Sequence, residues 1–97
     1  MEEHAKKVAE LLKLLANEHR LLILCALIQG PRNVSQIHAY TPNITASALS
    51  QHLNQLRSAG LLRSEKRGMN VVYWIGDHRV LSLIDVLKEQ YCKEEAP

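Results

Sequence analysis

The chain has 97 residues, of which 46% are hydrophobic and 23% are charged, and its formal net charge is +2. This length suits one globular domain, and the longest apolar run, residues 21–28, is much shorter than the roughly 20 residues that cross a bilayer. Residues 1–4 lack the basic-then-apolar order of a secretory signal. We therefore expect a single domain over residues 1–97, located in the cytoplasm and not in a membrane.

Positive charge is concentrated in the middle of the chain. Residues 20–79 hold seven basic residues and two acids, whereas both ends are acidic. A basic segment of this kind suits a polyanionic partner, although a solvated surface would carry the same charges. The basic residues are Arg20, Arg32, Arg57, Arg63, Lys66, Arg67 and Arg79, and the acids are Glu65 and Asp77.

The first third of the chain has the periodicity of helices. A first helix is predicted over residues 3–16, because its apolar residues recur with the spacing of one helical face. Asn17 is suited to cap a second helix, which Gly30 and Pro31 would end. Residues 21–28 are apolar nearly all round, so we expect this helix to be buried on most sides. The apolar face of the first helix consists of Val8, Leu11, Leu12 and Leu15.

Two further helices are predicted before the periodicity changes. Asn33 and Gln36 resemble a capping box at the start of a short third helix over residues 34–39. Thr45 can cap a fourth helix that ends at Gly60. The buried stripe of the fourth helix would consist of Leu49, Leu53 and Leu56.

The last third of the chain indicates a hairpin and a helix. Residues 62–66 and 71–75 are rich in β-forming residues, and the basic, glycine-containing tip between them predicts a β-hairpin. From Asp77 onward the helical period returns. The predicted fold is mainly α with one β-hairpin, in the order ααααββα, which is a helix-turn-helix followed by a wing.

The fourth predicted helix carries a distinctive polar face opposite its leucine stripe. Four uncharged hydrogen-bonding side chains lie there at helical spacing, and such groups suit the base edges of DNA, whereas an ordinary solvated face would carry more Lys and Glu. Arg57, Lys66 and Arg67 would hold phosphates, although charge alone would also keep a hairpin soluble. We expect His52, nearer the buried side, to be a packed or hydrogen-bonded histidine. The four polar residues are Ser47, Ser50, Gln51 and Asn54.

Several segments together resemble the ArsR family of winged-helix repressors. They are LLANEHRLLIL at residues 14–24, SALSQHL at 47–53, LRSAGLL at 56–62 and the hairpin at 66–73, and the resemblance covers nearly the whole chain. It implies a repressor that binds double-stranded operator DNA as a homodimer, through its first and last helices, until a chemical signal releases it. The residues expected at the dimer interface, where they offer more apolar face than one small domain needs, are Leu11, Leu12, Leu83, Ile84 and Leu87.

The metal-sensing patterns of this family are not met. Some members carry a Cys-x-Cys cluster on the third helix, where this chain has no cysteine. Others use Asp and His pairs along the last helix, where His78 is the only histidine beside Asp77 and Asp85. Because a soft-metal site needs three or four converging ligands, we expect no metal site and no cofactor, and haem or a metal remains an alternative.

The two cysteines, Cys25 and Cys92, allow more than one interpretation. A disulfide scaffold would contain more cysteines, and Cys25 could simply be a small core residue, with Cys92 incidental near the end of the chain. Their positions resemble the dithiol branch of the ArsR family, which includes BigR, SqrR, YgaV and HlyU. Members of that branch sense persulfides and oxidants, and some have been linked to haem or organotin.

The resemblance to this branch implies that Cys25 and Cys92 form a thiol sensor, in which one thiolate attacks a persulfide and the other thiol resolves the adduct. Sensing of a metal ion, haem or another small ligand is the alternative. The sequence has no paired carboxylates, Ser-His-Asp set or glycine-rich phosphate loop, so we do not expect an enzyme.

Overall fold

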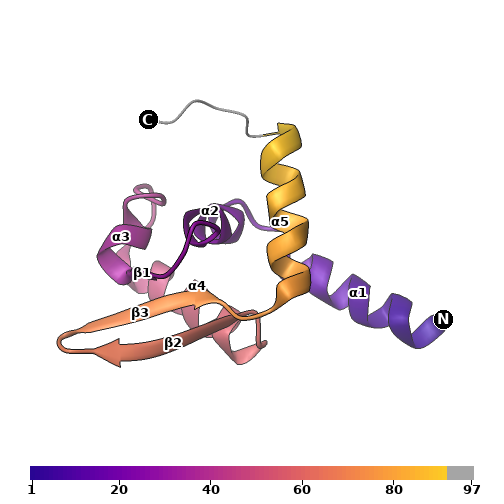
Figure 1. The fold of residues 1–97 in the computed structure, drawn as a ribbon, viewed down its shortest axis with the longest axis horizontal. Coiled ribbons are helices and arrows are strands. Elements are labelled where there is room, and N and C mark those ends of the chain that lie inside the picture. Colours follow the sequence, from indigo (N-terminus) through magenta and orange to yellow (C-terminus); the bar gives the residue numbers. More distant parts are fainter. Residues whose placement is uncertain (92–97) are drawn as a thin grey trace.

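The computed structural model describes residues 1–91 of the chain. The elements are α1 (Glu2–Leu15), α2 (Glu18–Leu27), β1 (Arg32–Asn33), α3 (Val34–His38), α4 (Ala46–Ser58), β2 (Leu62–Arg67), β3 (Asn70–Ile75) and α5 (His78–Tyr91). The predicted fold class, mainly α with a β-hairpin, is confirmed. Figure 1 shows α1 and α5 toward one end of the molecule and the hairpin projecting from the other.

Side chains that accept backbone hydrogen bonds set the starts of three helices. Asn17 Oδ1 accepts two backbone N–H bonds, of 2.9 and 3.1 Å, at the start of α2. Asn33 and Gln36 form the predicted capping box of α3, with bonds of 2.9 and 2.8 Å. Thr45 Oγ1 accepts at the start of α4 (3.0 Å). Each cap satisfies donors that the first turn of a helix leaves unpaired, so these boundaries follow from local sequence.

The wing is the hairpin of β2 and β3. The two strands pair antiparallel along their whole length, up to Arg67 opposite Asn70. The connecting loop is therefore only Gly68 and Met69, two residues shorter than the expected tip. Gly68 has φ +63° and Met69 does not have a positive φ, which is the pattern of a type II′ turn, whose twist suits tightly paired strands.

The sequence did not predict β1, which adds a third strand to the sheet. This strand pairs antiparallel with β3, with Arg32 opposite Tyr73 and Asn33 opposite Val72, in the sheet order β1-β3-β2. Two residues are too few to show a strand period, and the partner strand lies far along the chain. The pairing ties the start of α3 to the base of the wing.

The core lies where the inner faces of the helices meet the sheet. Leu49, Leu53 and Leu56 of α4 are at most 1% exposed, as the predicted stripe requires. The middle of α2 is buried on most sides, also as predicted. The remaining buried apolar residues are Leu15, Ile23, Leu24, Ala26, Leu27, Ile37, Leu61, Leu62, Tyr73, Val80 and Ile84.

The helix α1 projects away from this core (Figure 1). Its only buried residue is Leu15, whereas Val8 and Leu12 are 52% and 50% exposed. Leu11 is half-buried and packs at the edge of the core. Two of the four residues of the predicted apolar face of α1, Val8 and Leu12, therefore remain exposed in the protomer.

The apolar face of α5 divides between core and surface. Leu87 is 36% exposed, and Leu83 is half-buried. Ile84 is 1% exposed, so it has no surface to offer a second subunit, and the dimer-interface role expected of it is corrected to a core role. The reason is that Ile84 lies one turn after the buried Val80, on the side of α5 that faces the protomer core.

Candidate nucleic-acid interface

The helices α3 and α4, with the turn between them, form the helix-turn-helix. A hydrogen bond between His38 Nε2 and the backbone carbonyl of Ile44 (2.9 Å) closes the turn. Ile37 is fully buried beneath α3, so α3 is anchored to the core on which α4 also packs. With its leucine stripe held inward, α4 presents its opposite face to solvent.

All four of the polar residues expected to read bases are exposed on α4. Among the hydrogen bonds of the described residues, none involves the side chains of Ser47, Ser50 or Gln51, so these donors and acceptors can meet a ligand directly. Asn54 Oδ1 accepts a long bond of 3.4 Å from Arg57 Nη2, one turn later on the same surface.

The wing carries the other expected contacts, and both are exposed. Lys66 lies near the tip, and Arg67 pairs with Glu65 at 3.5 Å, with about half of each side chain exposed (55% and 54%). An exposed ion pair of this kind contributes little to stability. Arg67 can therefore exchange the Glu65 carboxylate for a phosphate at small cost.

Two of the seven basic residues in the middle of the chain donate hydrogen bonds to other parts of the protein and are not free to contact a polyanion. Arg20 donates hydrogen bonds to α1 and α4. Arg32 donates through Nε to the backbone carbonyl of Ala26, and its guanidinium lies 5.2 Å from the centre of the Tyr40 ring. The sequence-based charge count therefore overstated the positive charge available to a polyanion. The sequence held a hint of the role of Arg20, because this arginine directly precedes the apolar run of α2 and is the last charged residue of that helix.

His52 is the hydrogen-bonded histidine that the sequence predicted. Its Nδ1 accepts from Arg20 Nε at 3.1 Å, and its ring centre lies 6.0 Å from that of His19. Burial first, and then the positive charges of Arg20 and His19, lower the pKa of His52 below its ordinary value. His52 is thus held neutral and belongs to the internal support of α4.

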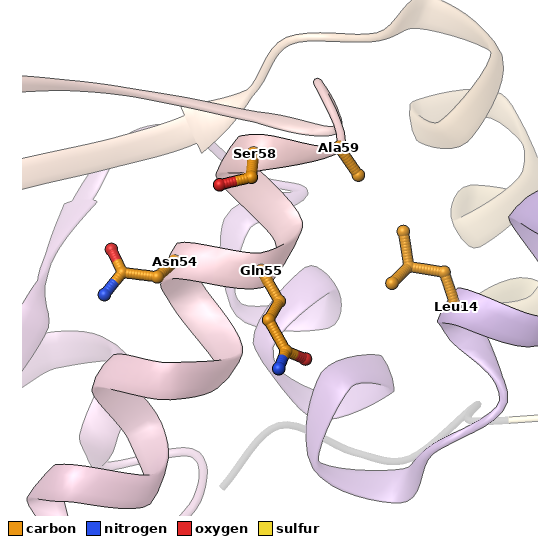
Figure 2. A pocket seen from close by; sticks show the side chains of 5 residues that line it. All are labelled: Leu14, Asn54, Gln55, Ser58 and Ala59. Carbon is orange, nitrogen blue, oxygen red and sulfur yellow. The ribbon is translucent and has the colours of Figure 1, made fainter.

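A shallow hollow separates the end of α1 from the second half of α4. Figure 2 shows Leu14 across from Ala59 and Gln55, while the Asn54 amide points away from α1. The hollow has a volume of about 440 Å³, and Ser58 also lines it. Because it is wide open to solvent and carries few polar groups, it does not resemble an enclosed ligand site.

The similarity of this chain to known proteins extends over nearly its whole length. The profile described as bacterial regulatory protein, arsR family, matches residues 17–64. The transcriptional activator HlyU of Vibrio cholerae is 38% identical over 96% of this chain and 85% of HlyU. The chain belongs to the ArsR family. The biofilm growth-associated repressor of Agrobacterium fabrum is 35% identical over 98% of this chain and 80% of its own.

The fold agrees with that of a solved ArsR-family relative. The structure of reduced HlyU from Vibrio cholerae N16961 matches with a TM-score of 0.89 at 38% identity, covering 96% of this chain and 97% of that one. The resemblance to the ArsR family, and to its branch that contains HlyU, is confirmed. As an ArsR-family member the protein is a DNA-binding transcriptional regulator and not an enzyme.

Of the two cysteines expected to form a sensor, Cys25 falls within the described part of the chain. Cys25 lies on α2, half-buried at the edge of the core, and Cys92 lies outside the described residues. Within residues 1–91 no cluster of three or more His, Cys, Asp or Glu side chains could hold a metal ion. No helix in that part of the chain is long and apolar enough to cross a membrane.

Acid should destabilise the fold through His52. A histidine whose pKa is lowered on folding stabilises the fold above its unfolded-state pKa, near 6.5, and this contribution is lost as the pH falls through the folded-state pKa. We expect the free energy of unfolding in urea to fall between about pH 7.5 and about pH 5 more steeply for the wild type than for His52→Asn, which cannot titrate. Equal slopes would contradict this role.

Proposed function

We propose that the protein is a homodimeric repressor that acts in the cytoplasm and binds double-stranded operator DNA through α4 and the wing. The observation that carries this proposal is the exposed, uncharged hydrogen-bonding face of α4 beside a cationic hairpin. The major groove admits an α-helix, and side-chain amides and hydroxyls discriminate its base edges. The Agrobacterium fabrum relative is named a repressor and HlyU an activator, so a promoter–reporter assay in cells would measure the direction of regulation.

The proposed contacts divide into two kinds. Ser50 and Gln51, near the middle of α4, read bases, with Ser47 and Asn54 on either side of them. Arg57, Lys66 and Arg67 hold phosphates, which position the protein without reading sequence.

Substitutions should separate these two kinds of contact. Gln51→Ala is expected to cost roughly 1–3 kcal/mol of operator affinity and to relax specificity at one base step. Lys66→Ala should weaken binding to operator and random DNA alike and reduce the salt slope by about one. Lys7→Ala, an exposed lysine of α1, is the matched control and should change neither. Fluorescence anisotropy at several salt concentrations measures both effects, and a Gln51→Ala loss as large on random DNA would refute the assignment.

The uncovered face of α1 supports the dimer. An isolated helix of 14 residues is marginal in water, so α1 needs a partner for its apolar face. Exposed apolar residues on α5, Val86 and Leu87 at 57% and 36%, offer a second patch of the same kind. The proposed occupant is a second copy of the chain, with Leu11, Leu12, Leu83 and Leu87 at the interface.

Light scattering should therefore give twice the protomer mass of 11.0 kDa at micromolar concentration. Leu12→Glu places a charge in the proposed interface and is expected to yield monomers with reduced operator affinity. Lys6→Glu, on the opposite side of α1 by helical spacing, should remain dimeric. A monomeric wild type would overturn the dimer proposal.

The proposed signal acts on Cys25 and Cys92. Support comes from the packing of α2 against α5, because Cys25 belongs to α2 and Cys92 follows the last residue of α5. Membership of the HlyU branch gives further support, and one solved form of HlyU is described as reduced. Lys88 and Lys93 stand near Cys92 in sequence and would favour its thiolate, so Cys92 attacks first and Cys25 resolves.

A low-molecular-weight persulfide is the only oxidant needed to link Cys92 to Cys25. The Cys92 thiolate attacks the outer sulfur of a low-molecular-weight persulfide, which gives Cys92 persulfide and releases the parent thiolate. The Cys25 thiolate then attacks Cys92 Sγ and expels hydrosulfide, which leaves a disulfide. If a second sulfur is first transferred to the Cys92 persulfide, the Cys25 thiolate attacks the sulfur next to the terminal one and expels hydrosulfide, which leaves a bridge with one more sulfur.

Treatment of the reduced protein with glutathione persulfide should therefore link Cys25 to Cys92 and lower its DNA affinity. Mass spectrometry of the digested protein should find the cross-linked peptide pair. Cys25→Ser and Cys92→Ser should each bind operator DNA as the wild type does but stay bound after treatment. If persulfide treatment releases either variant from operator DNA as it releases the wild type, the dithiol switch is refuted. Sensing of a metal ion, haem or another small ligand would then become the leading alternative, tested by metal titration and visible spectra.

A further inference from the structure

The guanidinium of Arg20 joins three helices. Arg20 belongs to α2, and its Nη1 donates to the backbone carbonyl of Leu14 in the last turn of α1 (2.9 Å). Its Nε donates to His52 Nδ1 on α4 (3.1 Å), and its Nη2 donates to Gln55 Oε1 on the same helix. One rigid planar group therefore links the projecting helix α1 to α4.

The side of α4 that Arg20 contacts adjoins the side proposed to read DNA. His52 directly follows Gln51, and Gln55 directly follows Asn54, so each lies about 100° further around the helix. A rotation of α4 that breaks the bonds to Arg20 turns Gln51 and Asn54 by the same angle. The hydrogen bonds of Arg20 therefore fix how the DNA-facing side chains are aimed.

The ends of α1 and α4 share the core through Leu15 and Leu56, and Arg20 adds a direct polar link between them. Leu14 and Ala59 stand on opposite sides of the open hollow in Figure 2. The guanidinium and the Leu14 carbonyl therefore give a hydrogen-bonded connection from α1 to α4 beside the shared core.

The bond between Arg20 and His52 requires a neutral histidine. Nδ1 accepts, so the ring's proton must be on Nε2, and protonation of Nδ1 removes the acceptor and sets a second positive charge against Arg20. Within residues 1–91, the charged or titratable groups that act on His52 are Arg20 and His19, both on α2. The strand β2 also packs on α4, and its less exposed residues, Leu62 and Ser64, carry no charge.

We propose that Arg20 is a positioning residue that holds α4 in its DNA-binding orientation relative to α1, and that protonation of His52 releases this hold. The inference rests on the proposed DNA-reading role of α4. DNA binds the state in which His52 is neutral and accepts the hydrogen bond from Arg20. A protonated His52 must therefore lose one proton before the protein binds DNA. Affinity then falls by up to about tenfold for each pH unit below the His52 pKa. Protonation of an exposed histidine has the opposite effect, since added positive charge favours binding to phosphates.

The test uses the full-length protein and a duplex that the wild type selects from a random-sequence library. Fluorescence anisotropy measures DNA affinity from about pH 7.5, above the ordinary histidine pKa, to about pH 5, below it. The wild type should lose affinity with acid. His52→Asn offers an amide oxygen as a permanent neutral acceptor, so it should bind within about threefold of the wild type at the higher pH and show no loss in acid.

Arg20→Lys tests the positioning role itself. Lysine keeps the charge, but its single ammonium cannot span acceptors on two helices as the guanidinium fork does. We expect an affinity loss of at least about tenfold at the higher pH, with circular dichroism used to establish that the variant is folded at the assay temperature. A purely structural role for His52 would change stability without changing the pH profile of DNA binding in the folded protein.

The outcomes separate this inference from the proposed function. Gln51→Ala is measured in the same assay, and if it binds as the wild type does, α4 does not read DNA and both proposals fail. If Gln51→Ala loses affinity while Arg20→Lys binds normally, only the inference is overturned. The inference is overturned in the same way if the wild type and His52→Asn share one pH profile.

Discussion

Burial of the leucine stripe of α4 is the constraint on which the rest of the structure depends. Leu49, Leu53 and Leu56 are shielded from solvent, and truncation of a buried leucine costs about 2–5 kcal/mol against a typical domain stability of about 5–15 kcal/mol. Because the helical period is fixed, burying this stripe obliges the Ser, Gln and Asn side chains of α4 to face outward. The surface proposed to read DNA is therefore set by core packing.

The small size of the core explains why helices at one end of the molecule remain incompletely covered. A domain of 97 residues cannot bury both faces of every helix, and α1 leaves Val8 and Leu12 about half exposed. If a second subunit covers this face, the spacing of the two α4 helices depends on how α1 and α5 meet their partners. Cys25 on α2, and Arg20 between α1 and α4, then lie on the structural route from the dimer interface to the DNA.

Positive charge in the middle of the chain serves two separate purposes. Arg20 and Arg32 are partly buried, and each satisfies backbone or side-chain acceptors in the protein, as a cation removed from water must. Arg57, Lys66 and Arg67 remain exposed around the polar face of α4 and the wing. The lowered pKa of His52 is connected with the internal role of Arg20, because the neutral histidine ring is the acceptor that Arg20 requires.

The sequence by itself determined the helix starts at Asn17, Asn33 and Thr45, the leucine stripe, the hairpin and the polar face of α4. It also contained the family motifs. Each of these signals depends on residues a few positions apart, since caps and helical periods act locally. Only the tertiary structure decided that β1 pairs with β3, that Ile84 belongs to the core and that Arg20 binds His52. These pairings join residues far apart in the chain, so they exist only once burial of the apolar faces has brought those residues together.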